Sequence, residues 1–178
     1  MRKAFSLGVD FLVASVAGVF LWSFASQKLS RPSSRGEPVV GTSIGDLGID
    51  WQRAHVNLVF LLNRDCKFCT LTAPLYQRII SQYRSRSDVE FVALFPHEAR
   101  SGRTYLENVA LDIQHVRGPV VLPWGGYLTP TLLLCDRDGR VKRFWKGSLT
   151  EAVKQDIVRG IDAYLGEAVP NSAGATSH

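Results

Sequence analysis

Cysteine is scarce in this chain, at 3 of 178 residues. That is too few for a small domain held together by several disulfides. A basic excess is also missing from most of the chain, because residues 37–178 carry 16 basic and 15 acidic side chains. A nucleic-acid-binding domain needs basic side chains concentrated on its folded part, so we expect no nucleic-acid partner. Apolar residues are plentiful at 46%, enough to pack the core of one ordinary domain.

The N-terminal residues form one long apolar run. Phe11 to Ala25 carries no charge over 15 residues, and extending it back to Phe5 adds only the charge of Asp10. About 20 apolar residues span a bilayer, so residues 1–27 predict one N-terminal transmembrane helix in contact with lipid. A cleaved signal peptide stays open as the alternative, because the run ends in the small-x-small form of a cleavage site. Basic residues flank both ends, so the positive-inside rule does not fix the orientation.

The chain beyond this run divides by composition. Residues 28–50 predict a linker, because the stretch 30–41 is rich in Ser, Pro, Gly and Arg and has no apolar period. Residues 51–168 predict the folded domain. Residues 169–178 are small and polar and predict a flexible tail.

Strand and helix patterns alternate along the predicted domain. The near-continuous apolar run Val56–Asn63 predicts a central strand buried on both faces. The remaining predicted elements are strands at Val89–Phe95, Thr131–Cys135 and Val141–Trp145, a hairpin turn at Asp136–Gly139, and helices around residues 71–83, Thr104–His115 and Glu151–Leu165. This order predicts an α/β fold with a mixed central sheet flanked by helices.

Two of the predicted helices carry a clear apolar stripe. The inward positions expected are Leu71, Leu75, Ile79 and Tyr83 in the first helix, and Ala152, Ile157, Ile161 and Leu165 in the last. Thr150 is the candidate N-cap of the last helix.

The candidate chemistry lies where the first strand meets the first helix. Cys66-Lys67-Phe68-Cys69 follows the strand and opens the helix, so the first thiol lies near unpaired N–H groups and the positive end of the helix dipole. A thiolate is stabilised there, which lowers the pKa of Cys66 and makes it the candidate nucleophile. Arg64 and Lys67 add positive charge, opposed by Asp65. Cys69, deeper in the helix, would be the resolving thiol that attacks a mixed disulfide.

These residues resemble the thioredoxin superfamily. Cys66 and Cys69 occupy the place of the family's redox-active disulfide, and Ala73-Pro74 repeats its Ala-Pro after the second cysteine. Thr129-Pro130 precedes the third strand, where the family has a cis-proline facing the redox pair, and Gly147 matches a family glycine. The resemblance, which runs from about Val56 to Leu165, implies a thioredoxin-like fold. It also implies that Thr129 and Pro130 bind substrate by pairing with an incoming strand.

The apolar N-terminus and the stretch Thr129–Gly147 look like the membrane-anchored TlpA-like and ResA-like proteins of this superfamily. That implies a domain on the extracytoplasmic, periplasmic side that reduces disulfides of partner proteins such as apocytochromes c. A membrane dithiol protein would then be the electron donor. Asp65 replaces the group's usual Trp, so a dithiol oxidant stays open. The strand Val56–Leu62 has no acidic residue where many thioredoxins keep a buried proton acceptor, which leaves the proton of Cys69 unassigned.

Other roles for the cysteine pair also stay open. The pair could form a static disulfide or half of a zinc site, with Cys135, His55, His97 and His115 as the remaining ligands. The sequence has no second paired motif, so we expect no metal and no cofactor. Cys135 is predicted to be a core thiol, and His97 and His115 to be surface side chains. A non-catalytic thioredoxin-like binding or assembly module and a metal-delivery protein remain the functional alternatives.

Overall fold

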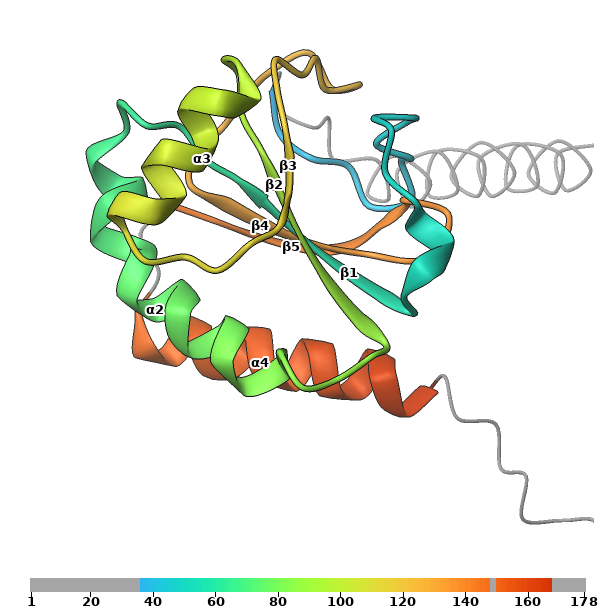
Figure 1. The fold of residues 1–178 in the computed structure, drawn as a ribbon. Coiled ribbons are helices and arrows are strands. Elements are labelled where there is room, and N and C mark those ends of the chain that lie inside the picture. Colours follow the sequence, from blue (N-terminus) through green and yellow to red (C-terminus); the bar gives the residue numbers. More distant parts are fainter. Residues whose placement is uncertain (1–35, 148–149, 168–178) are drawn as a thin grey trace, which may run out of the picture. The chain divides into compact units, whose positions relative to one another are not determined.

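The computed structural model describes residues 36–147 and 150–167 (Figure 1). The predicted transmembrane helix in residues 1–27 and the predicted tail at 169–178 lie outside the described residues. Within the described ranges, no helix has both the length and the apolar character needed to cross a bilayer.

A five-stranded mixed sheet forms the centre of the domain. Its strands are β1 (Val56–Leu61), β2 (Val89–Leu94), β3 (His115–Arg117), β4 (Thr131–Cys135) and β5 (Val141–Lys146), in the order β3-β2-β1-β4-β5. β1, β2 and β3 run parallel, whereas β4 is antiparallel to both β1 and β5. Every residue of β1 is buried, as its continuous apolar run predicts. The combination of parallel and antiparallel pairings confirms the predicted mixed sheet.

The three α-helices bury their apolar side chains against the same face of this sheet. They are α2 (Lys67–Tyr83), α3 (Ala99–Asn108) and α4 (Glu151–Glu167), preceded by a 3-10 turn, η1 (Trp51–Arg53). Successive steps from β1 to β2 to β3 move in one direction across the sheet, and right-handed crossovers then place α2 and α3 on one side. α2 and α4 lie side by side below the sheet in Figure 1.

Irregular chain covers the opposite face. Ile44 and Leu122 are buried there in a second core, with partly buried residues from 47–51 and 120–127 packed around them. A bridge between Ser43 and Arg140 attaches this segment near the start of β5. The Arg117 guanidinium donates hydrogen bonds of 3.1 and 2.6 Å to the carbonyls of Leu47 and Gly48. Residues 43–51 therefore pack on the sheet.

The helix predicted at Thr104–His115 is wrong in position. α3 runs from Ala99 to Asn108 and ends where Ala110 adopts a φ of 53°. The Leu111 N–H then bonds the Leu106 carbonyl at 2.9 Å, which closes a Schellman-type helix end. The chain after it turns extended and enters β3 at His115, a strand that the sequence analysis missed. The apolar spacing was ambiguous because Leu111 and Ile113 are buried outside any helix.

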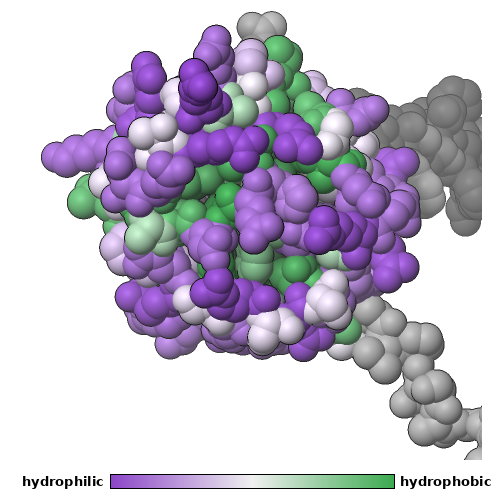
Figure 2. Space-filling model, viewed as in Figure 1, coloured by the Kyte–Doolittle hydropathy of each residue, from purple (hydrophilic) through white to green (hydrophobic). Residues whose placement is uncertain are grey.

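The predicted stripes of the other helices are largely confirmed. Leu75, Ile79 and Tyr83 are buried in α2, and Ile157, Ile161 and Leu165 in α4. Leu71 and Ala152, however, are exposed. The Thr150 hydroxyl accepts the Val153 N–H at 3.4 Å, so Thr150 does cap α4. Figure 2 shows apolar surface in the middle of the face that Figure 1 presents, surrounded by polar side chains.

Candidate redox site

The loop between β1 and α2 is shaped by local hydrogen bonds. The Asn63 side chain accepts the Asp65 N–H at 3.0 Å, and the Asn63 carbonyl accepts the Cys66 N–H at 3.1 Å. This tight turn is typical of Asn after a strand. Cys66 is then the N-cap of α2, with φ −91° and ψ 106°, and its carbonyl accepts the Cys69 N–H at 3.0 Å. The first thiol therefore stands at the helix start and the second lies one turn inside.

Thr129 meets the first thiol from the other side of the site. The Cys66 S–H donates to the Thr129 carbonyl over 3.7 Å. The peptide bond from Thr129 to Pro130 is cis, as the resemblance implies. The Gly147 N–H donates to the Pro130 carbonyl at 2.8 Å, which fastens this turn to the end of β5. The four residues singled out by the sequence, Cys66, Cys69, Thr129 and Pro130, therefore come together.

The environment of Cys66 favours its thiolate. Partial burial raises the pKa of Cys66, but hydrogen bonds with the side chains of Thr129 and Cys69 and with the backbone N–H groups of Cys69 and Phe68 outweigh it, so its pKa is below the usual value. The direction agrees with the sequence-based expectation. The backbone N–H groups at the helix start are among the causes, as expected, and the Thr129 side chain is a cause that the sequence did not indicate, whereas the charges of Arg64 and Lys67 are not among them.

Cys69 is in the opposite situation. Its side chain is fully buried, and burial raises its pKa to about 12, with further increases from the neighbouring Cys66. Burial disfavours a thiolate because the charged form loses its hydration. Both cysteines are free thiols here, so the partly exposed Cys66 is the stronger acid and the buried Cys69 holds its proton at neutral pH.

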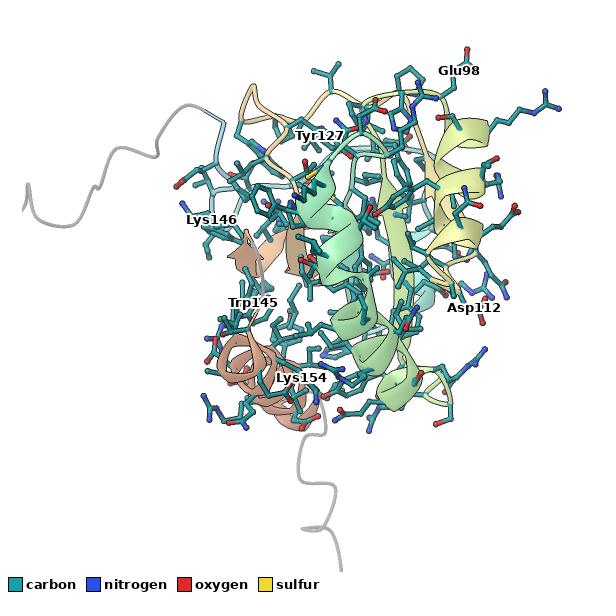
Figure 3. The ribbon with its side chains drawn as sticks, turned by 90° about the vertical axis from the view of Figure 1, so that its left-hand side faces the viewer. Glu98, Asp112, Tyr127, Trp145, Lys146 and Lys154 are labelled. Carbon is teal, nitrogen blue, oxygen red and sulfur yellow. The ribbon has the colours of Figure 1, made fainter. Side chains whose placement is uncertain are left out.

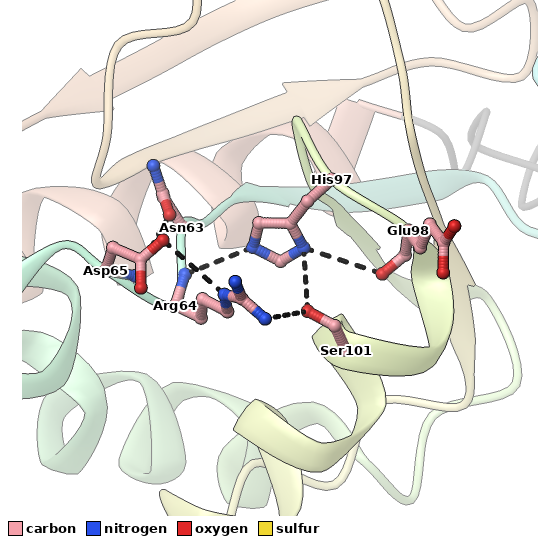
Figure 4. A network of polar contacts seen from close by, with 6 residues as sticks. All are labelled: Asn63, Arg64, Asp65, His97, Glu98 and Ser101. Carbon is pink, nitrogen blue, oxygen red and sulfur yellow. Dashed lines mark hydrogen bonds and ion pairs between the residues drawn. The ribbon is translucent and has the colours of Figure 1, made fainter.

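A polar network lies behind the cysteine loop (Figure 4). His97 Nε2 accepts the Arg64 N–H at 3.4 Å, while its Nδ1 faces the Ser101 hydroxyl at 3.2 Å. The Arg64 side chain donates to Ser101 at 3.1 Å and pairs with Asp65 at 3.4 Å. The loop before Cys66 is thus connected to the start of α3. His97, predicted to be a surface side chain, is half-buried and takes part in this network.

Apolar side chains flank the exposed thiol. Phe68 and Leu71, on the first turns of α2, are 56% and 62% exposed. Leu128, which precedes Thr129, is 38% exposed. Exposed apolar side chains gathered around a reactive group are typical of a surface that contacts another protein. The prediction that Leu71 lies in the core is therefore wrong. An apolar residue at helical spacing can lie in the core or on a surface that contacts another protein, and the sequence pattern does not distinguish the two.

The other candidate ligands lie apart from the pair. Cys135 is buried at the end of β4 in the second core, where burial and the nearby Asp136 raise its pKa. His115 is half-buried and its Nε2 lies 3.2 Å from a Glu90 oxygen. Among residues 36–147 and 150–167, no three His, Cys, Asp or Glu side chains are grouped to hold a metal ion.

No protein-family model and no curated relative matches this chain. Solved structures do match its fold. A candidate thiol:disulfide interchange protein DsbE from Chlorobium tepidum matches with a TM-score of 0.58 and 22% identity, over 73% of this chain and 100% of its own. A candidate thioredoxin from Neisseria meningitidis matches with a TM-score of 0.53 and 16% identity, over 72% of this chain and 86% of its own. The thioredoxin-like superfamily protein SPOA0173 matches with a TM-score of 0.51 and 23% identity, over 67% of this chain and 85% of its own.

This chain therefore has the thioredoxin-like fold that its motifs predict. At these identities the likeness concerns the fold, and the chemistry depends on the residues of this chain. Three tyrosines whose hydroxyls are buried without a hydrogen-bond partner among the described residues, Tyr76, Tyr105 and Tyr127, were not singled out from the sequence. An aromatic residue in an apolar helix stripe or a glycine-containing loop is more often a packing residue, so the pattern gave no reason to select them.

Proposed function

We propose that this chain is a thiol–disulfide oxidoreductase that reduces disulfides of partner proteins. The observation that carries the proposal is the placement of the two thiols. Cys66 is half-buried at the N-cap of α2 with a lowered pKa, and Cys69 is buried one turn later. An accessible thiolate beside an inaccessible thiol supports a division of roles, in which the first is the nucleophile and the second is the resolving group.

The reaction runs in two exchanges. The Cys66 thiolate attacks a sulfur of the substrate disulfide, forms a mixed disulfide and releases the first substrate sulfur as a thiolate. Cys69 loses its proton and attacks the Cys66 sulfur, and the second substrate sulfur leaves and takes up a proton. The backbone of Thr129, whose carbonyl lies 3.7 Å from the Cys66 sulfur, would pair with the backbone of the substrate strand. A dithiol protein must then return two electrons to the Cys66–Cys69 disulfide.

The setting of this reaction is also part of the proposal. The apolar residues 1–27 support an anchor in the membrane, with the domain on the extracytoplasmic side and a membrane dithiol protein as its donor. Apocytochromes c are the substrates that the TlpA-like and ResA-like resemblance favours. The exposed Phe68, Leu71 and Leu128 favour a protein as the substrate.

Single cysteine variants test the proposal. Cys66→Ser should abolish reduction of insulin disulfides by the dithiothreitol-recycled protein. Cys69→Ala should accumulate mixed disulfides, visible by non-reducing electrophoresis and mass spectrometry. Cys135→Ala is the matched control, because that thiol lies in the other core, and it should keep full activity. An active Cys66→Ser variant would eliminate the proposed mechanism.

The direction of electron flow needs a separate measurement. A dithiol oxidant uses the same sulfur atoms, and 30 mV of reduction potential corresponds to about 1.4 kcal/mol for this couple. Equilibration of the chain with glutathione buffers gives the potential of the pair. A potential well below that of the compartment supports the reductase, and a high potential supports the oxidant.

A further inference from the structure

Three consecutive backbone N–H groups in the turn before α2 have hydrogen-bond acceptors. The Asn63 side chain accepts the Asp65 N–H at 3.0 Å, and the Asn63 carbonyl accepts the Cys66 N–H at 3.1 Å. The Arg64 N–H, the first of the three, bonds Nε2 of His97 at 3.4 Å (Figure 4). Two of these acceptors belong to the turn itself, whereas His97 belongs to the segment between β2 and α3. His97 therefore ties the turn that carries Cys66 to a different part of the fold.

The neighbours of His97 define which nitrogen of its ring carries the proton. A backbone N–H can only donate, so Nε2, which faces the Arg64 N–H, is unprotonated. A backbone carbonyl can only accept, and Nδ1 lies 3.5 Å from the Glu98 carbonyl oxygen and 3.2 Å from the Ser101 hydroxyl. Nδ1 therefore carries the proton, and the ring is the neutral Nδ1–H tautomer.

The His97 ring is held in this orientation by packing as well. It lies against the buried Phe95 ring, with the centroids 5.1 Å apart and the planes tilted by 33°. The Ser101 hydroxyl accepts the Arg64 guanidinium at 3.1 Å, so both the backbone and the side chain of Arg64 join this network. At Gly118 a Cβ would lie 2.1 Å from the His97 carbonyl oxygen, so the His97 backbone is closely packed too. The imidazole is thus an acceptor at a defined place.

Protonation of His97 would remove this acceptor. An imidazolium carries a proton on each nitrogen, so its Nε2–H would face the Arg64 N–H, one donor against another. The charged side chains that line the pocket in front of the network are Arg64, Asp65, Glu98 and Arg100. Asp65 pairs with the Arg64 guanidinium, and the Glu98 carboxylate points away from the ring in Figure 4. Neither carboxylate therefore pairs with the ring to offset the lost hydrogen bond.

We propose that neutral His97 is a positioning residue, which accepts the Arg64 N–H and thereby keeps the Cys66 thiol at the start of α2, and that protonation of His97 weakens this hold. The inference rests on the proposed function, because it concerns the thiol that begins the exchange. Cys66 is the group that reacts, and His97 acts on it through the backbone of residues 64–66. Imidazoles titrate between about pH 5 and 8, so acid should slow Cys66 by more than protonation of its own thiol requires.

Alkylation of Cys66 over a range of pH tests this role. The reduced full chain, in detergent micelles, reacts with iodoacetamide at about pH 5 to 8, and peptide mass spectrometry gives the rate for Cys66. His97→Gln keeps an acceptor that does not titrate, in the form of the amide oxygen, whereas His97→Phe removes the acceptor and keeps a ring against Phe95. His115→Gln is the matched control, because that half-buried imidazole lies 3.2 Å from Glu90, outside the network.

The ratio of rates between variants is the decisive quantity, because titration of the Cys66 thiol affects both rates alike. At about pH 8 the parent chain and His97→Gln should react equally fast. At about pH 5 the parent chain should be about three- to tenfold slower than His97→Gln, as expected for loss of one neutral hydrogen bond. His97→Phe should be slower than His97→Gln by a similar factor at every pH, and His115→Gln should follow the parent chain. A merely structural role would not make the ratio depend on pH.

Nitrogen-15 NMR of the His97 ring in the parent chain gives a second test, which holds even if a variant does not fold. Near pH 8 the spectrum should show the proton on Nδ1, with the signal assigned by its loss in His97→Gln or, if that variant does not fold, through the backbone. A proton on Nε2, or a ratio of rates that does not change with pH, would overturn the role of His97 and leave the oxidoreductase intact. Failure of the proposed function gives a different result, since a Cys66→Ser variant would then still reduce insulin disulfides.

Discussion

Two cysteines separated by two residues acquire opposite acidities because a helix begins between them. The first, Cys66, precedes the first turn and receives the N–H groups of Phe68 and Cys69. The second, Cys69, is the third residue of α2 and faces the core beside Tyr76. Partial exposure and the lower pKa therefore go together in Cys66, which is the basis of its proposed role as the group that meets the substrate.

Alkylation of the reduced chain measures this difference. Cys66 should react with iodoacetamide with a pH midpoint below the ordinary cysteine pKa of about 8.5, because its thiolate is stabilised. Cys69 should stay unreacted well above that pH, since its pKa is raised to about 12. Peptide mass spectrometry after timed labelling gives the midpoint for each cysteine. A midpoint for Cys66 at or above that of free cysteine would contradict the proposed stabilisation by the helix start.

Sequence motifs located part of this site. The strand-to-helix position of Cys66 and Cys69 and the turn at Thr129-Pro130 could be predicted, because each motif is short and its residue types are unusual. The buried hydroxyls of Tyr76, Tyr105 and Tyr127 could not, because only the folded chain shows that they have no hydrogen-bond partner among the described residues. The contact of His97 with the Arg64 N–H joins residues 33 positions apart and has no sequence signal.

At the level of elements, predictability followed the strength of the pattern. The strands β1 and β4 had continuous apolar runs and the hairpin of β4 and β5 had a marked turn, and the bounds of these strands shifted by no more than two residues. The helix was predicted too far along the chain because the first half of α3 is polar and contains Gly102. The second half of α3 and the residues after α3 carry apolar side chains at helical spacing. β3 has only three residues, too few for a pattern. The second core is built from irregular segments around Ile44 and Leu122, which have no period to detect.

Gly102 is required by the packing of α3. A Cβ at this position would meet the buried Phe95 ring at 2.5 Å. Gly102→Ala should therefore destabilise the protein by about 1–3 kcal/mol through overpacking, despite the better helix propensity of alanine. Gly166→Ala in α4 is the control, since nothing lies within 4 Å of its Cβ, and it should stabilise by about 0.5–1 kcal/mol. Urea unfolding measures both, and a neutral Gly102→Ala would mean that Phe95 can move aside.

At the C-terminal end of α3, glycine in place of alanine should stabilise the protein. Ala110 has a φ of 53°, in the left-handed region that disfavours residues with a Cβ. Ala110→Gly should raise the free energy of unfolding by about 0.5–1 kcal/mol, because glycine adopts this conformation without steric cost. The same urea titration tests it. A loss of stability would show that the Ala110 methyl group contributes more by packing than it costs in conformation.

On the scale of the whole molecule, the site lies where the two cores of the sheet meet. Cys66 and Cys69 belong with the core on the helical side. The loop carrying Tyr127 packs on the core of the opposite side and then supplies Thr129 and Pro130. The start of α2 therefore meets a loop here, so that the Cys66 thiol and the Thr129 backbone, which we propose pairs with substrate, come from different sides of the sheet.

The same burial that separates the two thiols should make the reduced protein sensitive to alkali. Burial raises the pKa of Cys69, Cys135 and Tyr76, so the unfolded chain releases these protons at lower pH than the native chain does. Stability is then complete below the unfolded pKa values of about 8.5 and 10 and is lost as pH rises, by up to about 1.4 kcal/mol per pH unit for each group. Cys66, whose pKa is lowered, has the opposite sign and offsets part of this loss.

Urea unfolding of the reduced chain at about pH 8 and about pH 10.5 tests the prediction, and the free energy of unfolding should be lower at the higher pH. Cys135→Val is the informative variant, because it removes one buried thiol of the second core and leaves Cys66 and Cys69 in place. Its stability should fall less steeply with pH than that of the parent chain. Equal slopes would mean that Cys135 ionises as readily in the native state as in the unfolded chain, in conflict with its complete burial.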